Sequence, residues 1–428
     1  MKNSLALPLV AAAAIYSAPA LAAAPQSADA EMAALYRSKA FGVARQSLDK
    51  DYDRIVGEII TLTEIPAPPF KEQARGKAYL EMMRAAGLQD VEMDEVGNVM
   101  GLRKGAGGGP LLVVAAHLDT VFPEGTPVKV RREGDRLYAP GVGDDTCSLP
   151  VLLAFVRALD AAGIRTKGDI LFVGDVGEEG PGNLRGMRHL FTEGKYKGRI
   201  AQFISVEPGR DGITTGGVGS LRYKVRFMGP GGHSYGAFGL VNPAYAMGNA
   251  MVAFAKMPVP ETPKTTFNIG VVEGGTSVNS IPFETDMTVD MRSESAEALA
   301  RSDAYLKALL PGAVDAENAA RSTAKGKISY KMDLMGDRPV GHTPADAPLV
   351  KVAVAALKAG GGKAGFESGS TDSNMPMSLG IPAITIGSGF ESERSHALDE
   401  SLILDRPGTV RYMAIDLATI IAAAGLAK

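Results

Sequence analysis

The chain has 428 residues, of which 45 are Lys or Arg and 48 are Asp or Glu, giving a net charge of -3. This length predicts two or three domains of about 150 residues each. Hydrophobic residues make up 45% of the chain and charged residues 22%, which supports a large core and excludes wholesale disorder. Because no block of basic residues is present, nucleic acid is not expected as a partner. The single cysteine, Cys147, excludes an intrachain disulfide framework and a cysteine-rich zinc site.

The first residues have the pattern of a signal peptide. Met1 and Lys2 give a short positive start, an apolar stretch follows, and Ala20-Leu21-Ala22 fits a small-x-small cleavage site. We therefore predict a signal peptide over residues 1–22 and export to the periplasm or the medium. A membrane anchor is the alternative, because about 20 apolar residues could span a bilayer. Pro8, Pro19 and the lack of a basic stop favour cleavage, and no membrane association is expected afterwards.

Residues 27–216 alternate between predicted helices and buried strands. The helices are predicted over Ala30–Leu62, Lys71–Ala86, Leu149–Ala162 and Asn183–Phe191, and the strands over Gly97–Leu102, Leu111–Ala116, Asp169–Val173 and Ala201–Val206. Continuous apolar runs are typical of strands that are buried on both faces. The alternation predicts an α/β fold with a mostly parallel sheet covered by helices.

The pattern changes at about Gly217. Leu221–Phe227 alternates apolar with basic residues, which is typical of a strand with one face in water. Further elements are predicted over Pro243–Lys256 (helix), Phe267–Val272 (strand), Asp286–Arg292 (strand), Ala296–Leu310 (helix) and Lys327–Met332 (strand). The buried pattern returns after Asp337, with a helix over Pro348–Ala359, a strand over Ala383–Gly387 and a helix over Gly408–Ala424. We predict one domain formed by residues 27–216 and 336–428, interrupted by a two-layer α+β domain over residues 217–335.

Imidazoles and carboxylates recur where predicted strands or turns end. They are His117 with Asp119, Asp144 with Asp145, Glu178 with Glu179, Glu207, and His396. Taken alone, His117 could equally be a core histidine, and one of the paired aspartates is expected to cap the helix that begins at Leu149. Adjacent acids repel each other, so a bound cation or a raised pKa is expected at Glu178 and Glu179. Two imidazoles and three carboxylates, one of them shared, suit a pair of divalent ions such as zinc and leave one Glu as a general base.

The ordered set of motifs resembles the co-catalytic di-zinc metallopeptidases that include aminoacylase, glutamate carboxypeptidase, peptidase T and succinyl-diaminopimelate desuccinylase. The matching segments are HLDTV at His117, GVGDD at Gly141, GEEG at Gly177, VEP at Val206, GGHS at Gly231 and the late His396. The resemblance implies two divalent ions, Zn²⁺ in the first place and Co²⁺ or Mn²⁺ as alternatives. It implies that the ions are held by Asp144 as the bridge, by His117 and Glu207 at one site, and by Glu179 and His396 at the other.

The resemblance also implies how the remaining residues act. Glu178 would be the general base that activates a water bridging the metals, and Asp119 would orient His117. The inserted domain resembles the family's lid and dimerisation domain, so a homodimer is implied. The substrate, a small peptide or an N-acyl amino acid, would contact His233, Asn279, Arg292 and Gly369. The chain departs from many relatives at Thr146-Cys147-Ser148, where Lys-Gly-Gly is common.

Two other functions fit parts of the sequence. Gly232-His233-Ser234-Tyr235-Gly236 satisfies G-x-S-x-G, so a serine hydrolase using Ser234, Asp372 and His396 is one alternative. That interpretation leaves the other imidazole and the paired acids without a role, and it needs a buried strand where the sequence alternates with basic residues. A metal-dependent binding protein without catalysis is the other alternative; it would keep the metal ligands but would not need Glu178.

Overall fold

The computed structural model describes residues 27–427, so the predicted signal peptide lies outside the described residues. The chain enters through α1 (Ala28–Arg37) and α2 (Lys39–Thr63), where one continuous helix was predicted. The break lies at Ser38, whose backbone is extended and whose side chain accepts a hydrogen bond from the amide of Phe41. Ser38 therefore ends one helix and caps the next, a role that serine performs well.

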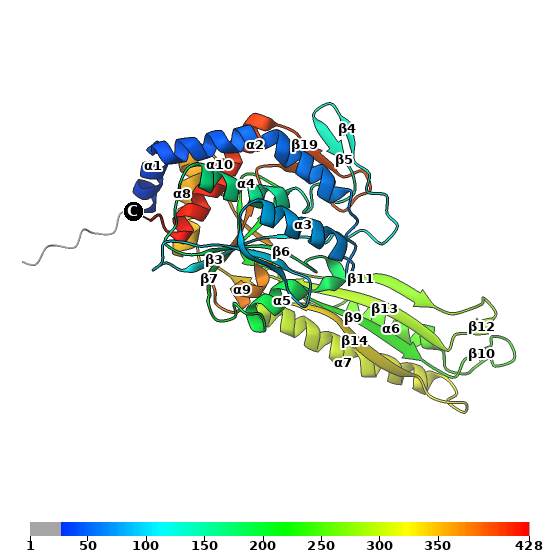
Figure 1. Cartoon of the computed structure of the whole chain (residues 1–428). Coiled ribbons are helices and arrows are strands. Elements are labelled where there is room, and N and C mark those ends of the chain that lie inside the picture. Colours follow the sequence, from blue (N-terminus) through cyan, green and yellow to red (C-terminus); the bar gives the residue numbers. More distant parts are fainter. Residues whose placement is uncertain (1–26, 428) are drawn as a thin grey trace, which may run out of the picture.

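A nine-stranded sheet forms the centre of the larger domain (Figure 1). Its strands run in the order β1 (Gln89–Met93), β2 (Val99–Arg103), β6 (Ile170–Asp175), β3 (Leu111–His117), β7 (Ile200–Glu207), β17 (Ala383–Gly387), β8 (Ile213–Gly217) and β15 (Gly341–His342), with β16 (Phe366–Gly369) also paired to β8. The four central strands β6, β3, β7 and β17 are parallel, and β2 and β8 run antiparallel to their neighbours β6 and β17. The predicted mostly parallel α/β architecture is confirmed.

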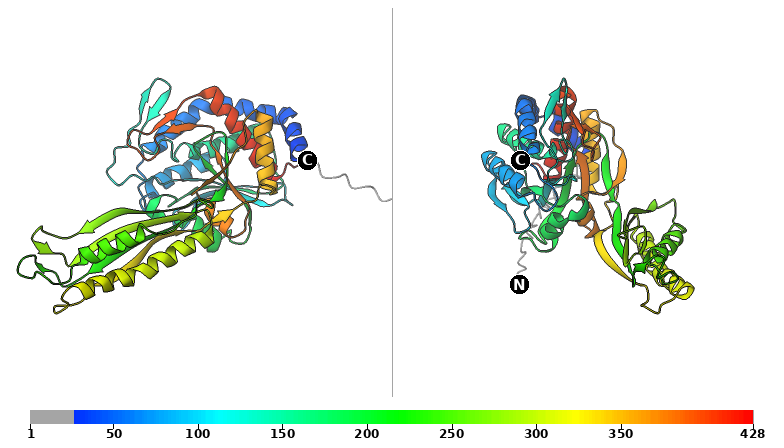
Figure 2. Two further views of the ribbon diagram at one scale, coloured as in Figure 1. Left: turned by 180° about the vertical axis from the view of Figure 1, so that it is seen from behind. Right: turned by 90° about the vertical axis from the view of Figure 1, so that its right-hand side faces the viewer.

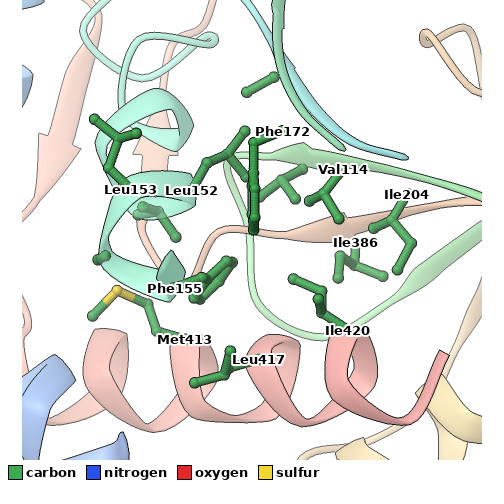
Figure 3. Packing of buried hydrophobic residues seen from close by; sticks show 14 of the residues in the cluster. Val114, Leu152, Leu153, Phe155, Phe172, Ile204, Ile386, Met413, Leu417 and Ile420 are labelled. Carbon is green, nitrogen blue, oxygen red and sulfur yellow. The ribbon is translucent and has the colours of Figure 1, made fainter. Parts of the chain in front are cut away.

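Helices cover both faces of this sheet. Val114 and Phe172 belong to one buried cluster, which they form with α3 (Gln73–Ala85), α4 (Ser148–Ala161), α8 (Pro348–Gly360) and α10 (Arg406–Ala424). Figure 3 shows this packing between α4, the sheet and α10. Val113 and Val173 belong to a second cluster with α5 (Arg185–Thr192) and α9 (Asn374–Ser378). Successive strand residues therefore face opposite apolar layers, as expected of strands buried on both faces.

A small four-stranded sheet lies beside the main one. It contains β4 (Arg131–Glu133), β5 (Arg136–Tyr138), β18 (Glu391–Glu393) and β19 (Ser401–Ile403), in the order β18-β19-β5-β4. The turn between β18 and β19 carries His396, and the segment after β5 leads to Asp144. This pairing brings together two parts of the chain that are about 265 residues apart in sequence.

The inserted domain projects from the larger one (Figures 1 and 2). Its antiparallel sheet has the order β11 (Thr265–Gly274), β13 (Glu284–Ser293), β9 (Gly219–Met228) and β14 (Ser329–Arg338). On one face, α6 (Pro243–Phe254) and α7 (Ala296–Ala320) pack over Tyr223, Val225 and Phe227. The short strands β10 (Gly232–His233) and β12 (Ser280–Ile281) pair at the end farthest from the larger domain (Figure 1).

Helix α7 is longer than predicted. The prediction ended it at Leu310, but the helix continues through Pro311 to Ala320. Its last turns are held by packing, since Ala313 and Val314 lie in the core of the inserted domain. Glu317, also buried, accepts a hydrogen bond from the amide of Asn242. Tertiary contacts here outweigh the local cost of proline in a helix. None of the helices between residues 27 and 427 has the length and apolar character needed to cross a membrane.

Candidate metal centre

The sheet topology brings the predicted metal ligands together. Strands β6, β3 and β7 are parallel neighbours, so their carboxyl ends lie at one edge. His117 is the last residue of β3, Glu207 is the last residue of β7, and Glu178 and Glu179 follow β6 by three and four residues. The turn between β18 and β19 of the small sheet places His396 beside Asp144 and Glu179.

Asp144 stands between the two imidazoles. Its Oδ1 lies 3.1 Å from Nε2 of His117, and its Oδ2 lies 3.2 Å from Nε2 of His396. His396 Nε2 is also 2.8 Å from Oε1 of Glu179, and His117 Nε2 is 4.0 Å from Oε2 of Glu207. Asp144 therefore presents one oxygen to each half of the cluster, which is the arrangement that a carboxylate bridging two cations requires.

The donor atoms are close enough to hold cations. In each of two groups, His117 with Asp144 and Glu179 and His117 with Asp145 and Glu207, one donor atom per residue lies within 4.8 Å of the others. Imidazole and carboxylate donors in this combination suit zinc and related divalent ions. Asp145 was not among the predicted ligands. It is fully buried, its Oδ2 accepts a hydrogen bond from the amide of His117, and its Oδ1 has no partner among the described residues.

The ionisable side chains of the cluster shift one another's pKa values. Burial raises the pKa of Glu207 well above its ordinary value, and the neighbouring Asp145 raises it further. Hydrogen bonds with Asp144 and Glu179 raise the pKa of His396 to about 10. For His117, burial lowers the pKa, but the hydrogen bond with Asp144 and the other carboxylates outweigh it and the net shift is upward. The upward pKa shifts of both imidazoles reflect the negative charge of the surrounding carboxylates, which divalent cations would neutralise when bound.

Asp119 holds the loop that carries the paired glutamates. Its carboxylate accepts hydrogen bonds from three successive amides, those of Gly177 (2.8 Å), Glu178 (3.1 Å) and Glu179 (2.9 Å). Its backbone carbonyl lies 3.0 Å from Nδ1 of His117, whereas its carboxylate is 3.8 Å from the same nitrogen. In the structure, the carbonyl of Asp119 is the group that orients His117, and the carboxylate orients the loop.

Glu400 holds the loop of Asp144 in the same manner. Its side chain is fully buried and accepts from the amides of Gly141 (2.9 Å), Gly143 (2.9 Å) and Asp144 (2.8 Å). Glu400 was not among the residues predicted from the sequence. Its position four residues after His396, within a polar segment, was the available signal. Each of the two loops that carry acidic ligands is therefore fixed by one buried carboxylate that accepts from three amides.

The cluster lies at the base of a cleft of about 470 Å³ that also reaches the inserted domain. Arg222 and Arg292 line the cleft from strands β9 and β13. Arg222 Nε donates to Oδ1 of Asp290 at 3.0 Å, and Arg292 Nε donates to Oδ2 at 2.8 Å. One carboxylate thus holds two guanidinium groups beside the cleft, leaving a net positive charge there.

The other residues predicted to contact the substrate lie elsewhere. His233 and Asn279 are near the far end of the inserted domain, where His233 pairs with Ser280 across β10 and β12, and neither lines this cleft. Gly369 ends β16, and the cleft is lined instead by Ser370 and Thr371, the next two residues. Within one chain, the structure therefore brings only Arg292 of this set beside the metal cluster.

One local prediction is wrong, and one alternative is not supported. Neither Asp144 nor Asp145 caps α4, since Cys147 occupies the N-cap position and makes no side-chain cap hydrogen bond. The serine triad is also not formed, because Ser234 lies in the inserted domain and His396 pairs with Asp144 and Glu179. Within residues 27–427, no hydrogen bond joins Ser234, Asp372 and His396, and the buried oxygens of Asp372 have no hydrogen-bond partner.

Comparisons with known proteins identify the family of the chain. Residues 113–407 match the model of peptidase family M20/M25/M40. Carboxypeptidase G2 of Pseudomonas sp. (strain RS-16) is 28% identical over 334 residues, covering 75% of this chain and 77% of that protein. Succinyl-diaminopimelate desuccinylase of Leptothrix cholodnii is 28% identical over 206 residues, covering 44% and 54%.

Solved structures show the same fold. A tripeptidase from Staphylococcus aureus superposes with a TM-score of 0.71 at 20% identity, covering 87% of this chain and 98% of that one. Aminopeptidase PepT from Bacillus cereus gives a TM-score of 0.68 at 21% identity, covering 87% and 99%. The family match spans the strands and loops that form the cluster. The chain therefore belongs to peptidase family M20/M25/M40, whose members are metal-dependent peptidases and amidohydrolases.

Proposed function

We propose that this protein is an exported di-zinc hydrolase that cleaves the peptide or amide bond of a small substrate with a free carboxylate, such as a di- or tripeptide or an N-acyl amino acid. The observation that carries the proposal is Asp144, which presents one oxygen to each of two imidazoles inside a cleft. His117, Asp144 and Glu207 would hold one ion. Asp144, Glu179 and His396 would hold the other, and Asp145 lies close enough to take part in the first site.

Glu178 is the residue that we assign as the general base. When bound, the two ions would polarise the scissile carbonyl and lower the pKa of a water molecule. Glu178 lines the cleft beside the cluster, and burial raises its pKa to about 7 although Arg338 opposes this shift. A carboxylate of that basicity suits a group that takes a proton from the attacking water and delivers it to the departing amine nitrogen.

The arginines beside the cleft support a substrate with a negative charge. The Nε atoms of Arg222 and Arg292 are held by Asp290, and Nη1 of Arg222 donates to the carbonyl of Gly180. Within the described residues no hydrogen bond uses the Nη groups of Arg292, so they can form the paired bonds that a carboxylate accepts. A cleft of about 470 Å³ has room for a small peptide or an acylated amino acid.

Two further parts of the proposal concern assembly and location. A homodimer formed through the inserted domain would give His233 and Asn279 a place near the substrate of the partner subunit. This assignment is supported by their exposed position at the end of that domain. Export is supported by the sequence of residues 1–22 alone. Light scattering of the purified protein and the N-terminal residue of the protein recovered from the periplasm or medium test these two parts separately.

The central test is a hydrolysis screen of dipeptides, tripeptides and N-acyl amino acids with the zinc-loaded protein and its Glu178→Gln variant. We expect turnover that chelation abolishes and zinc restores, and a loss of several orders of magnitude in the variant with zinc retained. Substrates blocked at the amino or at the carboxyl terminus show which free terminus the protein requires. Equal turnover by both proteins would refute the role of Glu178. Tight substrate binding without turnover by either protein would favour a metal-dependent binding protein.

A further inference from the structure

Arg338 makes direct contact with Glu178. It is the last residue of β14, at the point where the inserted domain returns to the larger one, and it is 5% exposed. Its Nη1 donates to Oε1 of Glu178 and to Oγ of Ser370, both at 3.0 Å, and its Nη2 donates to the backbone carbonyl of Glu178. Arg338 was not among the site residues predicted from the sequence, and it is not a ligand of the metal cluster.

The Arg338 guanidinium binds only one of the two carboxylate oxygens of Glu178. Oε1 is occupied by Arg338, whereas no hydrogen bond within residues 27–427 uses Oε2. The guanidinium also donates a hydrogen bond to the backbone carbonyl of Glu178, so it fixes both the backbone and the side chain of this residue. A planar guanidinium can hold two acceptors in a fixed geometry, whereas an ammonium group cannot.

Other contacts tie the same strand end to the loop of Glu178. Asp337 accepts hydrogen bonds from Arg188 at 2.8 Å and from Asn183 at 3.1 Å, and its amide donates to Asn183. Both partners belong to the segment that follows Glu179. These hydrogen bonds and those of Arg338 join the end of β14 to the loop that carries Glu178.

We infer that Arg338 is a positioning residue for Glu178, which holds the carboxylate so that Oε2 faces the reacting water and which links its position to the inserted domain. The inference rests on the proposed function of Glu178 as the general base. A misplacement of such a group by about 1 Å can cost roughly 100-fold in rate. Loss of Arg338 should therefore lower kcat, while KM and the metal content stay close to those of the parent protein.

The test compares Arg338→Ala with Arg226→Ala in the zinc-loaded protein. Arg226 is a matched control because it is also an arginine of the inserted sheet that pairs with a carboxylate of β14, Asp333, at 3.1 Å. We expect a loss of about 100-fold in kcat for Arg338→Ala, with KM changed by less than about threefold and two zinc ions retained. Added guanidinium ion should restore part of this kcat, and urea at the same concentration should not. Neither additive should raise the turnover of Arg226→Ala, whose kcat should match the parent.

Unchanged kcat in Arg338→Ala, a loss that follows zinc release, or the absence of guanidinium rescue would overturn the inference. If Arg338→Ala does not fold, Arg338→Lys provides the measurement: we expect about a tenfold lower kcat with zinc retained, and the parent kcat would contradict the inference. A different result would refute the proposed function itself: Glu178→Gln would retain the activity of the parent. Inactive Glu178→Gln beside fully active Arg338→Ala would refute only the role of Arg338.

Discussion

Replacing Arg292 by alanine should cost most for substrates that have a free carboxylate. Asp290 occupies Nε of Arg292, so two Nη groups remain for a ligand. Two charge-assisted hydrogen bonds at about 1.5 kcal/mol each, the low end of their range because Arg292 is partly exposed, amount to about 3 kcal/mol. At 1.36 kcal/mol per factor of ten, about 100-fold is lost in kcat/KM.

The assay measures kcat/KM for one peptide that the protein hydrolyses and for the same peptide with its carboxylate amidated. The parent should prefer the free carboxylate by about 100-fold, and Arg292→Ala should remove most of that preference. Arg292→Lys keeps the positive charge but loses the two parallel N–H donors of the guanidinium. Its preference for the free carboxylate should therefore lie between those of the parent and Arg292→Ala. Lys224→Ala is the control. Lys224 lies on the same face of β9 as Arg222, two residues away, but it pairs with Asp286 and does not line the cleft. An equal loss on both substrates would refute the assignment.

Two more predictions test the support of the site and of the core. In Glu400→Gln one carboxylate oxygen is replaced by an NH₂ group, which cannot accept hydrogen bonds from the backbone amides that Glu400 holds. Zinc affinity, measured by zinc titration, should therefore fall by about 10- to 100-fold. The control is Glu393→Gln, an exposed position on the same small sheet, which should show no such loss. Burial raises the pKa of Asp416 in α10 well above its ordinary value, so the parent loses up to about 1.4 kcal/mol of stability per pH unit as pH rises above about 4 towards the raised pKa. Asp416→Asn should remove this pH dependence, so its unfolding free energy, measured with urea, should rise relative to that of the parent between pH 5 and pH 8. A stability difference between the two proteins that does not change with pH would contradict this prediction.

The central strands were predictable because burial on both faces leaves a direct signal in the sequence. Leu111–His117 is an uninterrupted apolar run that ends in an imidazole, and the parallel order then places its end beside those of β6 and β7. The positions of His117, Glu179 and Glu207 in one cluster follow from this rule alone. The turn that carries His396 was placed by the resemblance, because nothing local shows that β19 pairs with β5.

The supporting residues were not predictable from local pattern. Asp119 and Glu400 act through backbone amides, and every residue except proline offers an amide, so the sequence does not show which loops they hold. Arg338 ends an exposed edge strand and resembles any other arginine of that sheet until the chain returns to the cleft. The continuation of α7 past Pro311 depends likewise on buried contacts that form only in the folded domain.

The most direct test of the account is anomalous X-ray diffraction at the zinc absorption edge from crystals grown with zinc. The account predicts two zinc peaks in each chain, one bound by His117, Asp144 and Glu207 and the other by Asp144, Glu179 and His396. A single peak, or zinc bound away from Asp144, would contradict the claim that this carboxylate joins two ions.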